Sequence, residues 1–130
     1  MRRRDPFTWW IVGLFAVAVA VRWLVFLRWY RDLPIGELND NVYYHETANQ
    51  LADGEGFVNP WSFRQGIVEP TAAHPPGFTV YLAIWSFFGL DSVTWHRLAG
   101  GVVSALVVVP VGLVVRRLAG TTAAIIGMAL

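Results

Sequence analysis

The feature that most constrains this chain is a hydrophobic segment from Trp9 to Leu27, which Arg22 alone interrupts. At about 1.5 Å per residue, a helix of this length reaches about 28 Å, close to the hydrocarbon thickness of a bilayer. Aromatic residues at both ends, with Trp29 and Tyr30 at the second, suit the interfacial belts of a membrane helix. The segment predicts a membrane-spanning helix and an all-α integral membrane protein, because only helices and closed barrels cross a bilayer.

Arg2, Arg3 and Arg4 precede this segment, and positive charge is usually retained in the cytoplasm. The N-terminus is therefore predicted to be cytoplasmic, at the plasma membrane, and the polar loop of residues 28–75 external. A cleaved signal peptide is the alternative, because Ala18-Val19-Ala20 resembles a cleavage site. The retained helix is favoured, because the sequence stays apolar well past that site, where a mature N-terminus would turn polar.

Three more apolar runs follow, at residues 76–90, 98–115 and 121–130. Together with the first they predict a multi-span helical bundle. Because the fourth run stops within a helix, we expect residues 1–130 to be the N-terminal fragment of a membrane domain. If the first three segments all cross, Arg116 and Arg117 lie outside, against the positive-inside tendency. Either the second segment is re-entrant or later sequence overrides the local charge.

The distribution of charged residues indicates that any catalytic or binding residues lie in the polar loop of residues 28–75. Charged residues make up 15% of the chain, against about a quarter of a typical soluble domain. Most of the acids lie between positions 32 and 69. The absence of cysteine excludes disulfides and thiolate chemistry, and the absence of lysine excludes a Schiff base. Neither a phosphate-binding glycine motif nor a basic aromatic patch is present, so no nucleic-acid partner is expected.

Within the loop, residues 41–52 predict a short amphipathic helix next to the membrane. Asn39 or Asp40 can cap its start, and Gly54 can end it. Residues 57–73 contain proline and glycine without a clear period and are predicted to be irregular. The apolar face of the helix, which we expect to lie on the membrane surface, is formed by Tyr44, Ala48 and Leu51.

Three residues are the main candidates for chemistry. Asp40 could be a general base if a membrane interface shields it, although local sequence favours a simple helix cap. His74, before two prolines, could bind a phosphate at a helix start, although an ordinary loop histidine is the commoner case. Arg22 could face an internal polar cavity or extend to the interface, and local sequence does not separate these two roles.

A second group of residues could shape the substrate site: Tyr43, Tyr44, His45, Glu46 and Arg64. Each of them is commonly an interfacial anchor or a solvated loop residue. His45 could also join His74 as a metal ligand, but two histidines of unknown separation do not indicate a metal. The cofactor is therefore left open, with a divalent metal as one option.

The stretch from Asp40 to Phe57, followed by His74-Pro75-Pro76-Gly77, resembles the start of the GT-C-fold glycosyltransferases that use polyprenyl-phosphate sugars. These are the family 39 and aminoarabinose-transferase-like enzymes. The shared pattern is an acidic residue, an aromatic residue four positions on, a glycine-rich helix end and a basic-Pro-Pro step. Residues 89–120 also resemble the third helix of that family.

The resemblance implies an inverting transfer of a sugar from a lipid-phosphate donor to a hydroxyl of a glycan, lipid or protein in the cell envelope. It implies Asp40 as the base, with His74 facing the donor phosphate and Arg22 assisting there. Many relatives have a second acidic residue where this chain has Asn41, which argues against a metal at that position. Without the later spans, the fragment alone is expected to be inactive. The alternative is a non-catalytic membrane protein: a degenerate relative, an assembly subunit or a transporter fragment.

Overall fold

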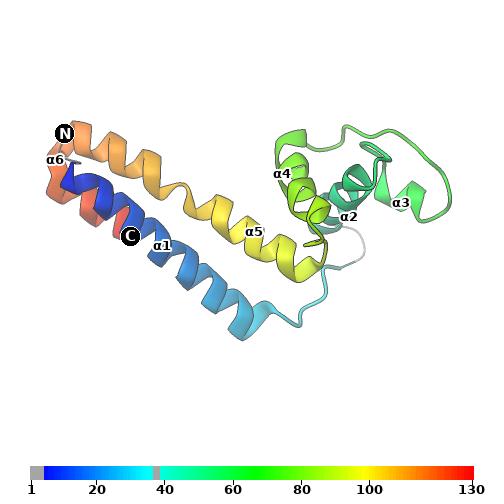
Figure 1. Cartoon of the computed structure of the whole chain (residues 1–130), viewed down its shortest axis with the longest axis horizontal. Coiled ribbons are helices and arrows are strands. Elements are labelled where there is room, and N and C mark those ends of the chain that lie inside the picture. The colour runs from blue at the N-terminus through cyan, green and yellow to red at the C-terminus, as the bar shows by residue number, and fades with distance from the viewer. Residues whose placement is uncertain (1–4, 37–38) are drawn as a thin grey trace. The chain divides into compact units, whose positions relative to one another are not determined.

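The computed structural model describes residues 5–36 and 39–130 and forms helices without strands over that range (Figure 1). The all-α prediction is therefore confirmed. The chain divides into two compact units. We call residues 5–30 with 100–130 the hairpin unit, and the described part of residues 31–99 the insert unit.

The first helix of the hairpin unit is α1 (Pro6–Val25), which continues as a π-helical turn, η1 (Phe26–Tyr30). It begins earlier than Trp9 because the Asp5 carboxylate accepts a hydrogen bond of 3.0 Å from the Phe7 amide. Pro6 occupies the first helical position, where its missing N–H costs nothing. The apolar helix thus extends over the whole range from residue 6 to residue 30.

The partner of α1 is formed by the end of α5 (Val93–Ala105) and by α6 (Val108–Ala129). Gly120 interrupts α6 with φ 85° and ψ 176°, a conformation that essentially only glycine adopts. Beyond it the chain turns back (Figure 1). Met128 thereby lies directly against Gly112. A small core, which contains Phe7, Val108, Ala124 and Met128, joins this turned-back end to α1.

Two stretches are long and apolar enough to cross a membrane, Pro6–Tyr30 and Val93–Ala129, and they favour a membrane location. The second apolar run of the sequence forms α4 (Pro76–Phe87), which ends before Leu90. With 12 residues it extends about 18 Å, well short of a bilayer. A multi-span bundle therefore remains a prediction, with two candidate crossings among the described residues.

The insert unit is built on α2 (Asp40–Ala52), which packs against α4. The predicted helix is confirmed and starts one residue earlier than expected. Its apolar face, however, packs on protein: Ala48 is fully buried in a cluster with Leu82 and Ala83. Tyr44 and Leu51 pack against the same cluster. The face that we expected on the membrane surface is covered by α4, because the neighbouring helix offers a matching apolar side.

The end of α2 follows the glycine signal in the sequence. Gly54 has φ 89°, and its amide bonds the Leu51 carbonyl at 3.2 Å. The Glu55 amide reaches back to the Gln50 carbonyl at 2.9 Å. This pair of bonds is the Schellman arrangement, which satisfies carbonyls left open at a helix end.

The segment that we expected to be irregular has some order. Val58 and Pro70 form an isolated β-bridge, and the Asn59 amide donates to the Glu69 carbonyl at 2.8 Å. Between them lies the single helical turn α3 (Pro60–Phe63). Residues 57–71 therefore form a closed loop with paired ends.

Candidate functional site

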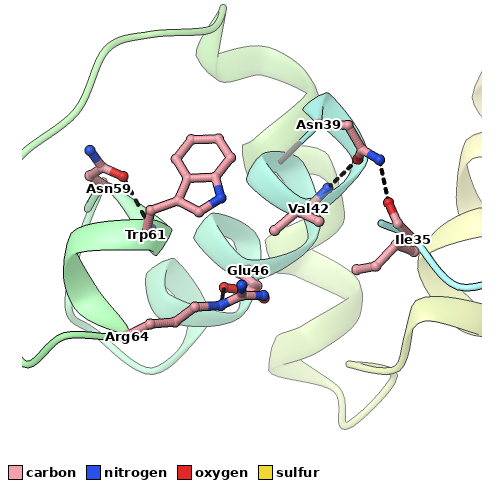
Figure 2. A network of polar contacts seen from close by, with 7 residues as sticks. All are labelled: Ile35, Asn39, Val42, Glu46, Asn59, Trp61 and Arg64. Carbon is pink, nitrogen blue, oxygen red and sulfur yellow. Dashed lines mark hydrogen bonds and ion pairs between the residues drawn. The ribbon is translucent and has the colours of Figure 1, made fainter. Parts of the chain in front are cut away.

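The candidate site begins at the first turn of α2. Asn39 adopts an extended conformation, and its Oδ1 accepts a hydrogen bond of 3.2 Å from the Val42 amide (Figure 2). Its Nδ2 donates to the Ile35 carbonyl. Asn39 is therefore the helix cap, and the alternative that Asp40 is only a cap is wrong. Asp40 is the first residue of the helix, with a side chain that has another partner.

That partner is His74. Its Nε2 lies 3.6 Å from Asp40 Oδ1, although the two residues are far apart in the sequence. The Asp40 side chain is 78% exposed, whereas that of His74 is 27% exposed. Protein atoms therefore leave the Asp40 carboxylate open to a ligand, and shielding by a membrane interface remains a prediction.

Two tyrosines hold the His74 ring. Its centroid lies 4.4 Å from that of Tyr43 and 5.2 Å from that of Tyr44. Tyr43 is almost completely buried, and Tyr44 is braced by Phe78 at the start of α4. The aromatic contacts fix the imidazole beside the first turn of α2, so four of the predicted site residues form one cluster. We call Asp40, His74, Tyr43 and Tyr44 the Asp–His cluster.

Glu46 and Arg64 form a separate ion pair further along α2. Arg64 Nε donates to Glu46 Oε2 at 3.0 Å, and a second guanidinium nitrogen binds the other oxygen (Figure 2). Two parallel bonds of this kind fix both side chains. The pair ties the loop after α3 to α2, which is a sufficient structural reason for both residues. Their predicted substrate contact remains a prediction.

His45 lies with His96. The two Nδ1 atoms are 3.0 Å apart, and His96 is only 5% exposed. Nothing in the local sequence around His96 indicates a buried partner 51 positions away. Burial lowers the pKa of His45, while Glu46 and Asp91 oppose the shift. In the described part of the chain, no group of three or more His, Asp or Glu side chains could hold a metal.

Arg22 belongs to the hairpin unit. One of its guanidinium nitrogens donates to the Ala18 carbonyl at 3.1 Å. The side chain is half-buried and borders a cavity of about 430 Å³. Apart from Arg22, that cavity is lined by apolar residues such as Leu14, Val17 and Val111. Arg22 therefore borders a half-open hollow whose other lining residues are apolar, and its two predicted roles remain open.

The Asp–His cluster combines an exposed proton acceptor with a fixed imidazole. Such a pair can accept a proton from a hydroxyl and place a hydrogen-bond donor or positive charge close by. No protein-family model, curated protein or solved structure matches the chain. The case for its function therefore rests on the cluster itself and on the sequence pattern around it.

Proposed function

We propose that the chain is the N-terminal part of a membrane glycosyltransferase, which moves a sugar from a polyprenyl-phosphate donor to an acceptor hydroxyl with inversion. Asp40 is the general base in this proposal. The observation that supports it most is the Asp40–His74 pair. Both residues were selected from the sequence for roles in the same reaction, and their side chains lie 3.6 Å apart.

The chemistry assigns each residue a role. In an inverting transfer the acceptor oxygen attacks the anomeric carbon on the face opposite the departing phosphate. Asp40 takes the proton from that hydroxyl, and His74 donates a hydrogen bond to the lipid phosphate. The phosphate leaves with the electron pair of the bond between the anomeric carbon and the phosphate oxygen.

The 3.6 Å separation also predicts a movement. Catalytic groups on opposite faces of a sugar in inverting glycosidases stand about 6.5–9.5 Å apart, so a sugar cannot fit between Asp40 and His74 as they lie here. The pair therefore opens when donor and acceptor bind. Asp40 is the more exposed partner and makes this movement, while the two tyrosines keep His74 in place.

Contacts in the hairpin unit support an external site. Arg116 forms a 2.6 Å ion pair with Asp5 and lies over the Phe7 ring. At the other end of α1, Gly101 approaches the Trp23 ring closely. Thus α1 runs antiparallel to the α5–α6 stretch, and Arg116 lies at the end where α1 begins.

This arrangement is compatible with a topology that avoids the charge conflict in the sequence. If α1 and the α5–α6 stretch each cross once and α4 does not cross, Arg116 and Arg117 share the cytoplasmic side with the N-terminal arginines, as the positive-inside tendency expects. The insert unit with its Asp–His cluster then lies outside, where lipid-linked sugars of the cell envelope would meet it.

The test is Asp40→Asn in the full-length protein, assayed in membranes with a polyprenyl-phosphate sugar. Loss of a general base typically lowers the rate by about 10²–10⁴-fold, and we expect at least the lower end of that range without loss of expression. Asp53→Asn is the matched control, because Asp53 is the C-cap of the same helix and is far from the cluster along it. Near-normal turnover of Asp40→Asn would overturn the proposal.

A further inference from the structure

A continuous chain of side-chain hydrogen bonds runs through the insert unit away from the Asp–His cluster. His45 meets His96 at 3.0 Å, and His96 Nε2 meets the Ser86 hydroxyl at 2.9 Å. The Ser86 hydroxyl donates to Asn49 Oδ1 at 2.7 Å, and Asn49 Nδ2 donates to the Asp91 carbonyl at 3.1 Å. The chain joins α2, α4 and α5.

The direction of this chain is fixed at the Asp91 end. A backbone carbonyl only accepts, so the Asn49 side chain must present Nδ2 to it and Oδ1 to Ser86. The hydroxyl proton of Ser86 therefore goes to Asn49 Oδ1 at 2.7 Å or to the Leu82 carbonyl at 3.3 Å. In either case Ser86 accepts from His96 Nε2–H. A neutral His96 then has a bare Nδ1, which must accept from His45 Nδ1–H. One carbonyl thus determines both imidazole tautomers.

The two rings differ in how they can take up a proton. His45 can be protonated at Nε2, and its Nδ1–H still donates to His96. His96 can be protonated only at Nδ1, which would set two N–H groups against each other. The pair therefore tolerates one positive charge and loses its hydrogen bond with two.

The surroundings disfavour the charged form. Burial lowers the pKa of His45, Glu46 and Asp91 raise it in part, and Arg97 lowers it further. From α4 the pair receives the Ser86 hydroxyl and no charged side chain, and Tyr81 on that helix is engaged with the Ala99 carbonyl. No carboxylate forms an ion pair with either ring in the described part of the chain, so charge on the pair is poorly compensated.

We propose that the His45–His96 pair is a proton-sensitive latch, which fastens the middle of α2 to the start of α5 and opens when both rings are protonated. At neutral pH the latch is closed and holds α2 in place. On acidification the second proton removes the bond between the rings, and the start of α5 separates from α2. The latch does not depend on the transferase proposal, because its test needs no substrate.

The sign of the pH effect follows from the lowered pKa of both rings. Burial is the largest cause for each, and it brings the pKa of His96 down to about 4. The folded unit therefore binds fewer protons than the unfolded chain below the ordinary histidine pKa of 6.5. The stabilisation is complete above that pH and is lost as the pH falls towards about 4, where His96 takes up the second proton.

The first experiment is nitrogen-15 NMR of the imidazoles in the whole chain in lipid nanodiscs. The chain has three histidines, so His74→Asn leaves only the latch pair visible. At about pH 8, where histidine is ordinarily neutral, we expect His45 protonated at Nδ1 and His96 at Nε2. The reverse tautomer on His96 would overturn the proposal.

The second experiment measures the separation of α5 from α2 as the pH is lowered. Hydrogen exchange of the α2 and α5 amides, corrected for the intrinsic pH dependence, should lose protection as His96 becomes charged. In His45→Asn, the side-chain amide of the new asparagine can still donate to His96 but cannot be protonated. Opening should then take up one proton instead of two, so the loss of protection should depend less steeply on pH. His74 lies beside the first turn of α2, so His74→Asn should keep the wild-type pH dependence at the middle of α2 and the start of α5. If both rings become charged while protection is retained, the latch does not exist.

Discussion

At the scale of single residues, the first turn of α2 shows how two neighbours divide two roles. Asn39 and Asp40 are both good helix caps, so the sequence left the cap open between them. The extended backbone of Asn39, with φ −144° and ψ 168°, makes it the cap. Asp40 is therefore available for chemistry, since the helix does not need its carboxylate for capping.

This division predicts unequal effects from adjacent substitutions. Asn39→Ala removes the acceptor for the Val42 amide and should lower the free energy of unfolding by about 0.5–2 kcal/mol. Asp40→Asn should lower it less, because it removes only an exposed negative charge at the helix start. Urea unfolding of the whole chain in mild detergent, followed by circular dichroism, measures both. Equal losses would mean that Asp40 contributes to capping.

The composition of the site was only partly accessible from the sequence. Asp40 and His74 became candidates through the resemblance to the glycosyltransferase pattern, whereas local sequence alone favoured a helix cap and an ordinary loop histidine. Their contact depends on how the loop of residues 57–71 closes, and local patterns do not specify that closure. His96 was missed for a related reason, since its burial comes from packing of α5 against two helices that lie earlier in the chain.

At the scale of elements, the residue at which a helix ends was easier to predict than the surface against which the helix packs. Gly54 marks the end of α2, because the chain needs a left-handed residue there and glycine takes that conformation without steric cost. The apolar face of α2 was also identified correctly. Periodicity shows that a face is apolar, but it cannot show whether lipid or another helix covers it.

The glycine at the end of α2 allows a matched test. Gly54→Ala places a Cβ at φ 89° and should cost about 1–2 kcal/mol of stability. Gly77→Ala is the control, because Gly77 lies in the first turn of α4, where no atom stands within 4 Å of an added Cβ. That change should be neutral or slightly stabilising. The shift in melting temperature relative to the wild type should differ between the two variants, either in sign or clearly in size. Similar decreases in both variants would contradict the helix end described here.

The break between the last two apolar runs was indicated by the sequence. Runs at 98–115 and 121–130 were predicted as separate spans, which implies a reversal between them, and Gly120 makes that turn. The sequence did not reveal how closely the two runs pack against each other. The tight contact of Met128 with Gly112 stabilises the reversal and becomes visible only in three dimensions.

At the scale of the whole molecule, one ion pair and one short helix favour two crossings over three. Three crossings would place Arg116 and Arg117 outside. The Asp5–Arg116 contact instead joins the start of α1 to the stretch that carries these two arginines, and α4 is too short to cross unaided. We therefore predict two crossings with the insert unit external, in agreement with the positive-inside tendency.

The lack of cysteine in the chain makes this topology directly measurable. Glu55→Cys and Ala119→Cys each introduce a single thiol at an exposed position, in the insert unit and beyond the arginine pair respectively. In intact cells, a membrane-impermeant maleimide should label position 55, while position 119 should react only after permeabilisation. Both thiols should react fully in detergent, which controls for local burial.

Labelling of position 119 from outside would require a third crossing by α4. The Asp–His cluster would then lie next to a true membrane span, and bilayer lipid could supply the shielding that its carboxylate lacks.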